Sequence, residues 1–295
     1  MESIVLVFLA GLVTAVATGL GALPFFFVDD FSDRWNVGLW GVASGIMVTV
    51  SVFGLVDEGI AYAAGGVPVL LIAGLLAGVV LVEVGDRLLD RVEVGGTDDR
   101  DHDNAPRAQT DGGHPADDAH DHAVEAKAIA DGTPKTLLLI LGILTIHSFP
   151  EGVAVGVSFA ELGLDGGIPL LGASVPVLAV FMTVAISVHN VPEGTAIAIP
   201  MRAMGLSKWR MVGAAVFSSL PQPIGAVIAY AFVTWAQSFL PFGYGFAAGA
   251  MVYLVVTEFI PEALETGEAL PNDGHRELAA GFGAGGVAML PLLVL

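Results

Sequence analysis

The stretch VPVLAVFMTVAISVHNVPEGTAIAIP, residues 175–200, is long and apolar enough to cross a membrane as one helix. Blocks of about 18 or more apolar residues are typical of membrane-spanning helices. Yet His189, Asn190 and Glu193 lie inside this block. Ionisable groups at membrane depth are costly and are functional by default. The stretch therefore predicts both a membrane fold and a polar site within the membrane.

The composition of the whole chain agrees with a membrane protein. Of its 295 residues, 55% are hydrophobic and only 14% are charged, whereas a soluble protein carries about 25% charged residues. The apolar residues gather in eight blocks, 4–27, 36–56, 67–86, 136–160, 175–200, 209–236, 241–261 and 278–295. The first block lacks the basic residues that open a signal peptide and is too long for one, so we expect it to be retained. We predict an all-α integral membrane protein with eight transmembrane helices.

The basic residues predict how the helices are oriented. All eleven fall in the connections after the first, third, fifth and seventh blocks: Arg34; Arg87, Arg91, Arg100, Arg107, Lys127 and Lys135; Arg202, Lys208 and Arg210; Arg276. Cytoplasmic loops of membrane proteins are enriched in Lys and Arg. We therefore expect these four connections in the cytoplasm and both termini outside it.

One long hydrophilic insertion, 87–135, divides the chain into three helices within 1–86 and five within 136–295. It cannot bury enough apolar surface to fold alone, so we expect a disordered cytoplasmic loop. The insertion is acidic and contains four of the seven histidines, His102, His114, His120 and His122. It is a solvated linker or, alternatively, a weak metal-collecting loop, because His-rich tracts often bind metals.

Composition also excludes several classes of protein. The chain has no cysteine, so a disulfide framework and a thiolate metal site are excluded. Its formal net charge of −19 argues against nucleic acid as a partner. The sequence contains no G-x-x-x-x-G-K-[ST] loop, so ATP is not implied.

The polar residues of the fifth block repeat a pattern of the fourth. HSFPEG at 147–152 and HNVPEG at 189–194 are near-duplicates. In each, the histidine and the glutamate are four residues apart, a spacing that places both side chains on one face of a helix. Imidazole and carboxylate are ligands that Zn2+ accepts. One copy alone could be a functionless kink with a hydrogen-bonded polar pair, but two copies favour a metal site.

The prolines and glycines of the two hexapeptides fit such a site. Pro150 and Pro192 each deprive the carbonyl four residues earlier of its usual partner. In a bilayer, that is tolerated only where the carbonyl is buried in protein or lines a wet cavity. Gly152 and Gly194 lack a side chain and should let another helix approach closely.

The two hexapeptides resemble the helix-4 and helix-5 signatures of the ZIP family of divalent-metal transporters, especially its prokaryotic GufA-like branch. The resemblance extends over the chain and includes ASGIMVTVSVFGLVDE at 43–58 and AAGAMVYLVVTEFIPEA at 247–263. It implies a binuclear metal site halfway through the membrane, between helices 4 and 5, and a homodimer. The residues that match family ligand positions are His147, Glu151, His189, Asn190 and Glu193.

Two further positions depart from the family pattern. Ser148 stands where the family usually has Asn, and Gln222 stands where many prokaryotic members have Glu. Both departures remove ligand strength or charge from the same second metal position. We therefore expect one tightly held ion near His147, Glu151, His189 and Glu193, with a second position that is weak or empty.

The carboxylates elsewhere on the helices have two possible interpretations. Glu258 and Glu262 resemble family carboxylates near the cytoplasmic exit, although Thr257 replaces the histidine that often precedes the first of them. An ordinary interfacial position explains them equally well. Asp57 and Glu58 end the second block, where a solvated helix terminus is the simpler interpretation and an entry funnel the alternative.

The sequence thus predicts a multi-pass cell-membrane transporter, not an enzyme, that carries Zn2+ into the cytoplasm as its substrate rather than as a cofactor. Fe2+, Mn2+ and Cd2+ are further candidate substrates. Efflux or exchange through the same site is an alternative, because sequence indicates the route better than the direction. An intramembrane zinc hydrolase is disfavoured, because the chain lacks His-Glu-x-x-His and its two motifs are near-duplicates.

Overall fold

A computed structural model describes residues 2–28, 32–62, 66–94, 147–163, 167–170 and 172–293. The predicted loop 87–135 lies outside the described residues except for its first part, which continues a helix to residue 94. Its four histidines lie outside the described residues as well.

Six helices in the described part of the chain are long and apolar enough to cross a membrane. They are Ser3–Phe26, Asp33–Ala61, Val69–Arg87, Val177–Ala203, Lys208–Trp235 and Gln237–Gly267. These six correspond to the first, second, third, fifth, sixth and seventh predicted blocks. Of the fourth block, 136–160, only the part from residue 147 is described, and it is helical to residue 158.

The helices contain several local changes of winding. Apart from the helical residues 147–158, the α-helices of the described residues are α1 (Glu2–Thr18), α2 (Asp33–Val50), α3 (Asp57–Ala61), α4 (Val69–Val94), α7 (Val177–Ala203), α8 (Lys208–Ser218), α9 (Pro221–Trp235), α10 (Leu240–Leu254), α11 (Ile260–Gly267) and α12 (His275–Ala288). Short 3-10 or π-helical segments are Gly19–Phe26, Ser51–Val56, Gln237–Phe239, Val255–Phe259 and Leu290–Leu293. The last of these, with α12, covers most of the eighth predicted block.

Two features differ from a plain set of apolar helices. The predicted helix 209–236 is divided between α8 and α9, because Pro221 and Pro223 supply no backbone N–H to continue the first half. A two-stranded antiparallel hairpin, β1 (Ile168–Leu170) and β2 (Ala173–Val175), precedes α7. The hairpin turns at Gly172, whose φ of +82° suits glycine.

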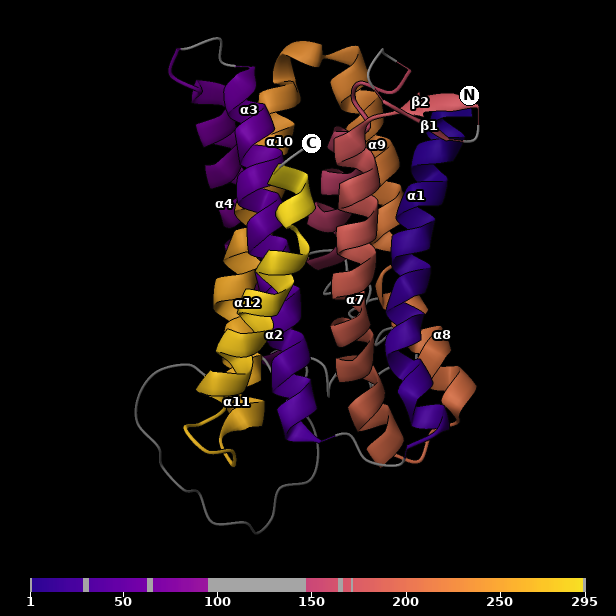
Figure 1. Ribbon diagram of the computed structural model, residues 1–295, viewed down its shortest axis with the longest axis vertical. Coiled ribbons are helices and arrows are strands. Elements are labelled where there is room, and N and C mark those ends of the chain that lie inside the picture. The colour runs from indigo at the N-terminus through magenta and orange to yellow at the C-terminus, as the bar shows by residue number, and fades with distance from the viewer. Residues whose placement is uncertain are drawn as a thin grey trace.

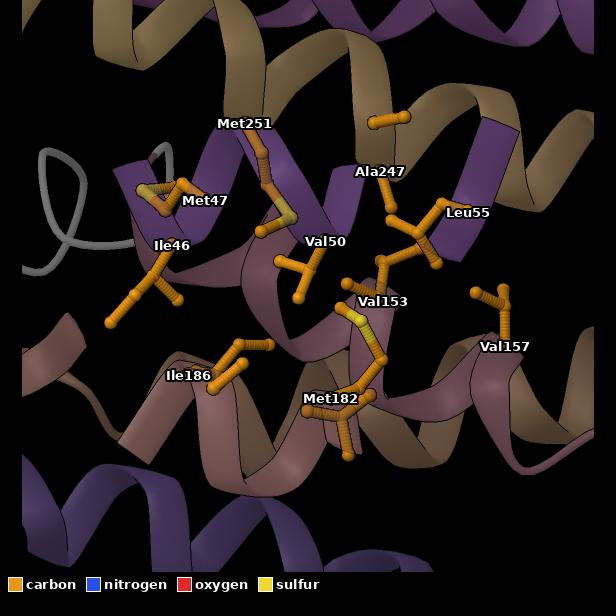
Figure 2. Packing of buried hydrophobic residues seen from close by; sticks show 14 of the residues in the cluster. Ile46, Met47, Val50, Leu55, Val153, Val157, Met182, Ile186, Ala247 and Met251 are labelled. Atoms are coloured by element: carbon orange, nitrogen blue, oxygen red, sulfur yellow. The ribbon is translucent and has the colours of Figure 1, made fainter. Parts of the chain in front are cut away.

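The helices form two groups that stand side by side (Figure 1). In one group α4 packs along α10 and α2 packs along α12, while in the other α1 packs on α7 and α9. Buried apolar side chains join the groups: Met47 and Val50 of α2 and Met251 of α10 face Val153 and Met182 (Figure 2). Their burial gives the helices that contain the two hexapeptides a rigid, close-packed support.

The described connections that contain basic residues lie together at one end of the molecule, which we call the basic end. The α1–α2, α7–α8 and α11–α12 connections, with their basic residues, lie at one end, and the N-terminus lies at the other (Figure 1). Exposed tryptophans occur in terminal turns of helices at both ends: Trp35 in the first turn of α2 and Trp209 in the first turn of α8 at the basic end, and Trp235 at the close of α9 at the other. Tryptophan is enriched at both faces of a membrane, so these residues mark two interfacial levels.

Candidate metal site

The two hexapeptides lie on helices that meet in the interior. HSFPEG opens the helical residues 147–158, and HNVPEG lies inside α7. The predicted close approach at their glycines is confirmed. A Cβ added at Gly152 would lie 2.2 Å from the carbonyl oxygen of Gln222, and one at Gly194 would lie 1.8 Å from that of Thr18.

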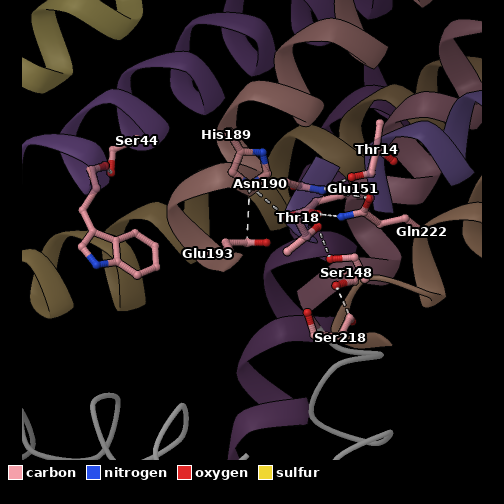
Figure 3. Close-up of polar contacts among 12 residues, drawn as sticks. Thr14, Thr18, Ser44, Ser148, Glu151, His189, Asn190, Glu193, Ser218 and Gln222 are labelled. Carbon is pink, nitrogen blue, oxygen red and sulfur yellow. Dashed lines mark hydrogen bonds and ion pairs between the residues drawn. The ribbon is translucent and has the colours of Figure 1, made fainter. Parts of the chain in front are cut away.

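Three of the predicted ligands form one group. Nε2 of His189 lies 3.1 Å from Oε1 of Glu151 and 3.4 Å from Oε1 of Glu193 (Figure 3). His189 and Glu151 are buried and Glu193 is partly buried. Neither ring nitrogen of His189 makes a hydrogen bond of good geometry among the described residues. One imidazole and two carboxylates, with ligand atoms within 4.8 Å of one another, are a donor set that suits a divalent cation.

Side-chain amides hold this group in place. Nε2 of Gln222 donates to Oε2 of Glu151, and Oε1 of Gln222 accepts from Nδ2 of Asn190 at 3.1 Å. The same Asn190 nitrogen donates to the backbone carbonyl of Thr14, at 2.8 Å. The break between α8 and α9 allows this arrangement, because it places Gln222 in the first turn of α9. An amide chain thus runs from α1 through α7 and α9 to Glu151.

The residues predicted at the second metal position have protein partners in this structure. Gln222 and Asn190 are bonded to each other, and Oγ of Ser148 donates to the carbonyl of Ser218 at 3.2 Å. Oδ1 of Asn190 is buried and has no hydrogen-bond partner among the described residues. Among the side-chain oxygens of these three described residues, it alone has no hydrogen-bond partner.

His147 does not join the other three ligands as the sequence suggested. Its Nε2 lies 3.1 Å from Oε1 of Glu258 and 3.8 Å from Oδ1 of Asp86, and these three partly buried residues form a second group. Glu258 lies in the π-helical segment Val255–Phe259, a kind of distortion that is frequent at functional sites. His147 therefore faces α4 and this segment, whereas Glu151, one turn later, faces α7.

Sequence reasoning missed Asp86, which closes the third apolar block. A carboxylate at the end of a span has a ready interfacial explanation, so only its proximity to His147 singles it out. Glu262, one turn beyond Glu258, belongs to neither group.

At the opposite end, the close of the second block is not fully solvated. Asp57 is exposed, but Glu58 is partly buried. Nearby, the hydroxyl of Tyr62, the residue that follows α3, donates to Oε1 of Glu161 at 2.6 Å, in the turn after residues 147–158. Burial and the Glu161 carboxylate raise the pKa of the Tyr62 phenol well above its usual value, so the phenol stays a donor.

Comparisons with known proteins point to one family. A family model described as ZIP zinc transporter matches residues 89–290. The zinc transporter GufA of Myxococcus xanthus is 30% identical over 261 residues, which are 86% of this chain and 87% of that protein. A putative zinc transporter of Arabidopsis thaliana is 34% identical over 88% of this chain, but this chain spans only 35% of that protein. The human zinc transporter ZIP11 is 42% identical over 130 residues, 44% of this chain and 36% of that protein.

Proposed function

The chain belongs to the ZIP zinc transporter family and is a multi-pass membrane protein, and from that premise we propose that it carries Zn2+ across the membrane into the cytoplasm. The observation that supports this proposal best is the buried group of Glu151, His189 and Glu193. It offers two negative charges and one imidazole inside helices of a membrane protein. Ionised side chains within a membrane are costly and mark functional sites. A transported dication would be the partner that balances the charges of the two carboxylates.

We infer the topology from the distribution of charge. The chain crosses the membrane eight times, three times within 1–86 and five times within 136–295, with both termini outside. The basic connections share one end of the molecule, with the N-terminus at the other (Figure 1), and this supports the assignment of the basic end to the cytoplasm. The insertion 87–135 then belongs to the cytoplasmic side.

The two groups define a route for the ion. Along the helix 147–158, His147 stands one turn before Glu151, so it is about 6 Å further toward the basic end. An ion that leaves Glu151, His189 and Glu193 would next meet His147, Asp86 and Glu258. The second group is more exposed than the first, so solvent competes with its ligands and release becomes easier. Glu262 is proposed as a later residue of this route.

The first group should hold one ion tightly. Glu151 and Glu193 offset the charge of one dication, but Gln222 and Ser148 add none. A second dication a few ångströms away would be repelled strongly outside bulk water. The position beside Asn190, Ser148 and Gln222 is therefore proposed to be weak or empty.

Uptake by proteoliposomes tests the proposal. Purified protein reconstituted in vesicles should take up radiolabelled Zn2+ faster than protein-free vesicles, and Fe2+, Mn2+ or Cd2+ should compete if they share the site. Vesicles loaded with zinc test the alternative of efflux or exchange. No zinc transport in either direction by folded protein would contradict the proposal.

A homodimer, expected from the family, is tested by the mass of the purified protein in detergent.

A further inference from the structure

The connection between α7 and α8 differs in charge from the rest of the chain. The formal net charge is −19, yet no Asp or Glu occurs from Gly194 to Thr257. The basic residues of that stretch are Arg202, Lys208 and Arg210, and all three flank the same connection. With three basic and no acidic residues, that stretch carries a formal charge of +3, and these basic residues lie at one corner of the basic end, which we call the α7–α8 corner.

A backbone carbonyl and two aromatic rings fix the position of the Lys208 ammonium. Nζ of Lys208 donates to the carbonyl oxygen of Phe26 at 2.9 Å and lies 5.6 Å from the centroid of the Phe26 ring. The Trp209 ring meets the same ring edge-on, with centroids 5.2 Å apart. The ammonium has three N–H groups, of which the carbonyl takes one. An ordered cation therefore remains able to donate to an acceptor from outside.

The corner is open at the level of a membrane surface. Trp209 is 73% exposed, its neighbour Arg210 is exposed, and Phe27 is 90% exposed. Tryptophan favours the headgroup level of a bilayer. Lys208 and Arg210, on either side of Trp209, then lie where lipid phosphates are found.

The opposite corner of the same end lacks this character. Arg34 there pairs with Glu277 at 3.1 Å, and α11 and the turn after it expose Glu265 and Glu268. Basic residues at that corner thus stand among carboxylates. General positive charge at a cytoplasmic face would not produce such a difference between corners.

We propose that the α7–α8 corner binds the phosphate of an anionic phospholipid headgroup. Lys208 and Arg210 are charged donors to phosphate oxygens, a role in which an Arg guanidinium can bind with two parallel hydrogen bonds. Trp209 and Phe27 contact the adjoining glycerol and acyl region. Because the partner lies beside the protein and not inside it, the proposal is independent of the metal site.

Native mass spectrometry of the purified full chain tests the proposal by comparing bound phosphatidylglycerol with bound phosphatidylcholine of the same acyl chains. The wild type should prefer the anionic lipid. Arg210→Gln should reduce that preference roughly fivefold, the factor given by about 1 kcal/mol per basic residue near a membrane surface. Arg276→Gln, an exposed arginine at the opposite corner, is the matched control and should leave it unchanged.

Lys208→Gln combined with Arg210→Gln should abolish the preference. Since Lys208 also caps the Phe26 carbonyl, the exposed Arg210→Gln alone decides the outcome if the double variant does not fold. Equal binding of the two lipids by wild type, or an equal loss in Arg276→Gln, would overturn the proposal. Displacement of the anionic lipid by an equal concentration of inorganic phosphate would assign the corner to free phosphate instead.

Discussion

Gln222 gives its amide hydrogen to one oxygen of Glu151 while the other oxygen of that carboxylate faces His189, 3.1 Å from its Nε2. The carboxylate is therefore shared between a neutral amide and the imidazole of the metal group. A glutamine satisfies the oxygen it faces without adding the charge that a second dication requires. Oε2 of Glu151 thus has its hydrogen-bond partner within the protein, in Gln222.

Replacing that amide by a carboxylate should change the number of bound ions. In Gln222→Glu, a third negative charge would offset the repulsion between two dications, so bound zinc should rise from about one to about two ions per chain. Uptake should slow, because transport needs a site that releases its ion. Native mass spectrometry counts the ions, and Gln237→Glu, the same change at an exposed residue, is the control. Tight binding of two ions by the wild type would contradict this reasoning.

Removing a carboxylate from the first group should abolish transport. Glu193→Ala leaves Glu151 as the only charge beside His189, which is too little to hold a dication in a site of low dielectric constant. We expect zinc uptake to fall to the level of empty vesicles while the protein remains folded in detergent. Glu265→Ala, at an exposed position on α11, should behave as wild type. Normal uptake by well-folded Glu193→Ala would refute the ligand assignment.

The second group should affect the rate of transport more than the affinity. Glu258→Gln removes a charge next to His147 but leaves Glu151, His189 and Glu193 in place. We expect uptake to slow by roughly tenfold, as for loss of a supporting ligand contact, with the dissociation constant for zinc little changed. Calorimetric titration and uptake rates separate the two effects, and Glu268→Gln is the exposed control. A parallel loss of affinity would place Glu258 in the tight site.

Gly194 should be intolerant of a side chain. A Cβ there would lie 1.8 Å from the carbonyl oxygen of Thr18, so α1 and α7 would have to separate, at a cost of about 1–3 kcal/mol or more for overpacking. The midpoint of thermal unfolding of Gly194→Ala should therefore fall. Gly213→Ala meets nothing within 4 Å and should be neutral or slightly stabilising. Equal midpoints for the two variants would contradict the close packing of the helices.

Much of the fold could be predicted because the bilayer restricts what a sequence can do. Apolar blocks of sufficient length must become helices to satisfy their backbone groups, and the six spanning helices found among the described residues correspond to six of the predicted blocks. The close packing at the glycine that ends each hexapeptide could also be predicted, because a missing side chain has few uses inside a span other than close approach. Local composition was sufficient for both.

The sequence by itself determined which residues share a helix face, since a spacing of four residues has that consequence wherever the helix lies. It could not determine which neighbouring helix each turn of that face meets, because this depends on the crossing and rotation of helices far apart in the chain. Only the tertiary structure directed His147 to Asp86 and Glu258 and placed Gln222 against Glu151. The sequence determines which residue types can bind a metal, but the packing of the helices determines their division into two groups.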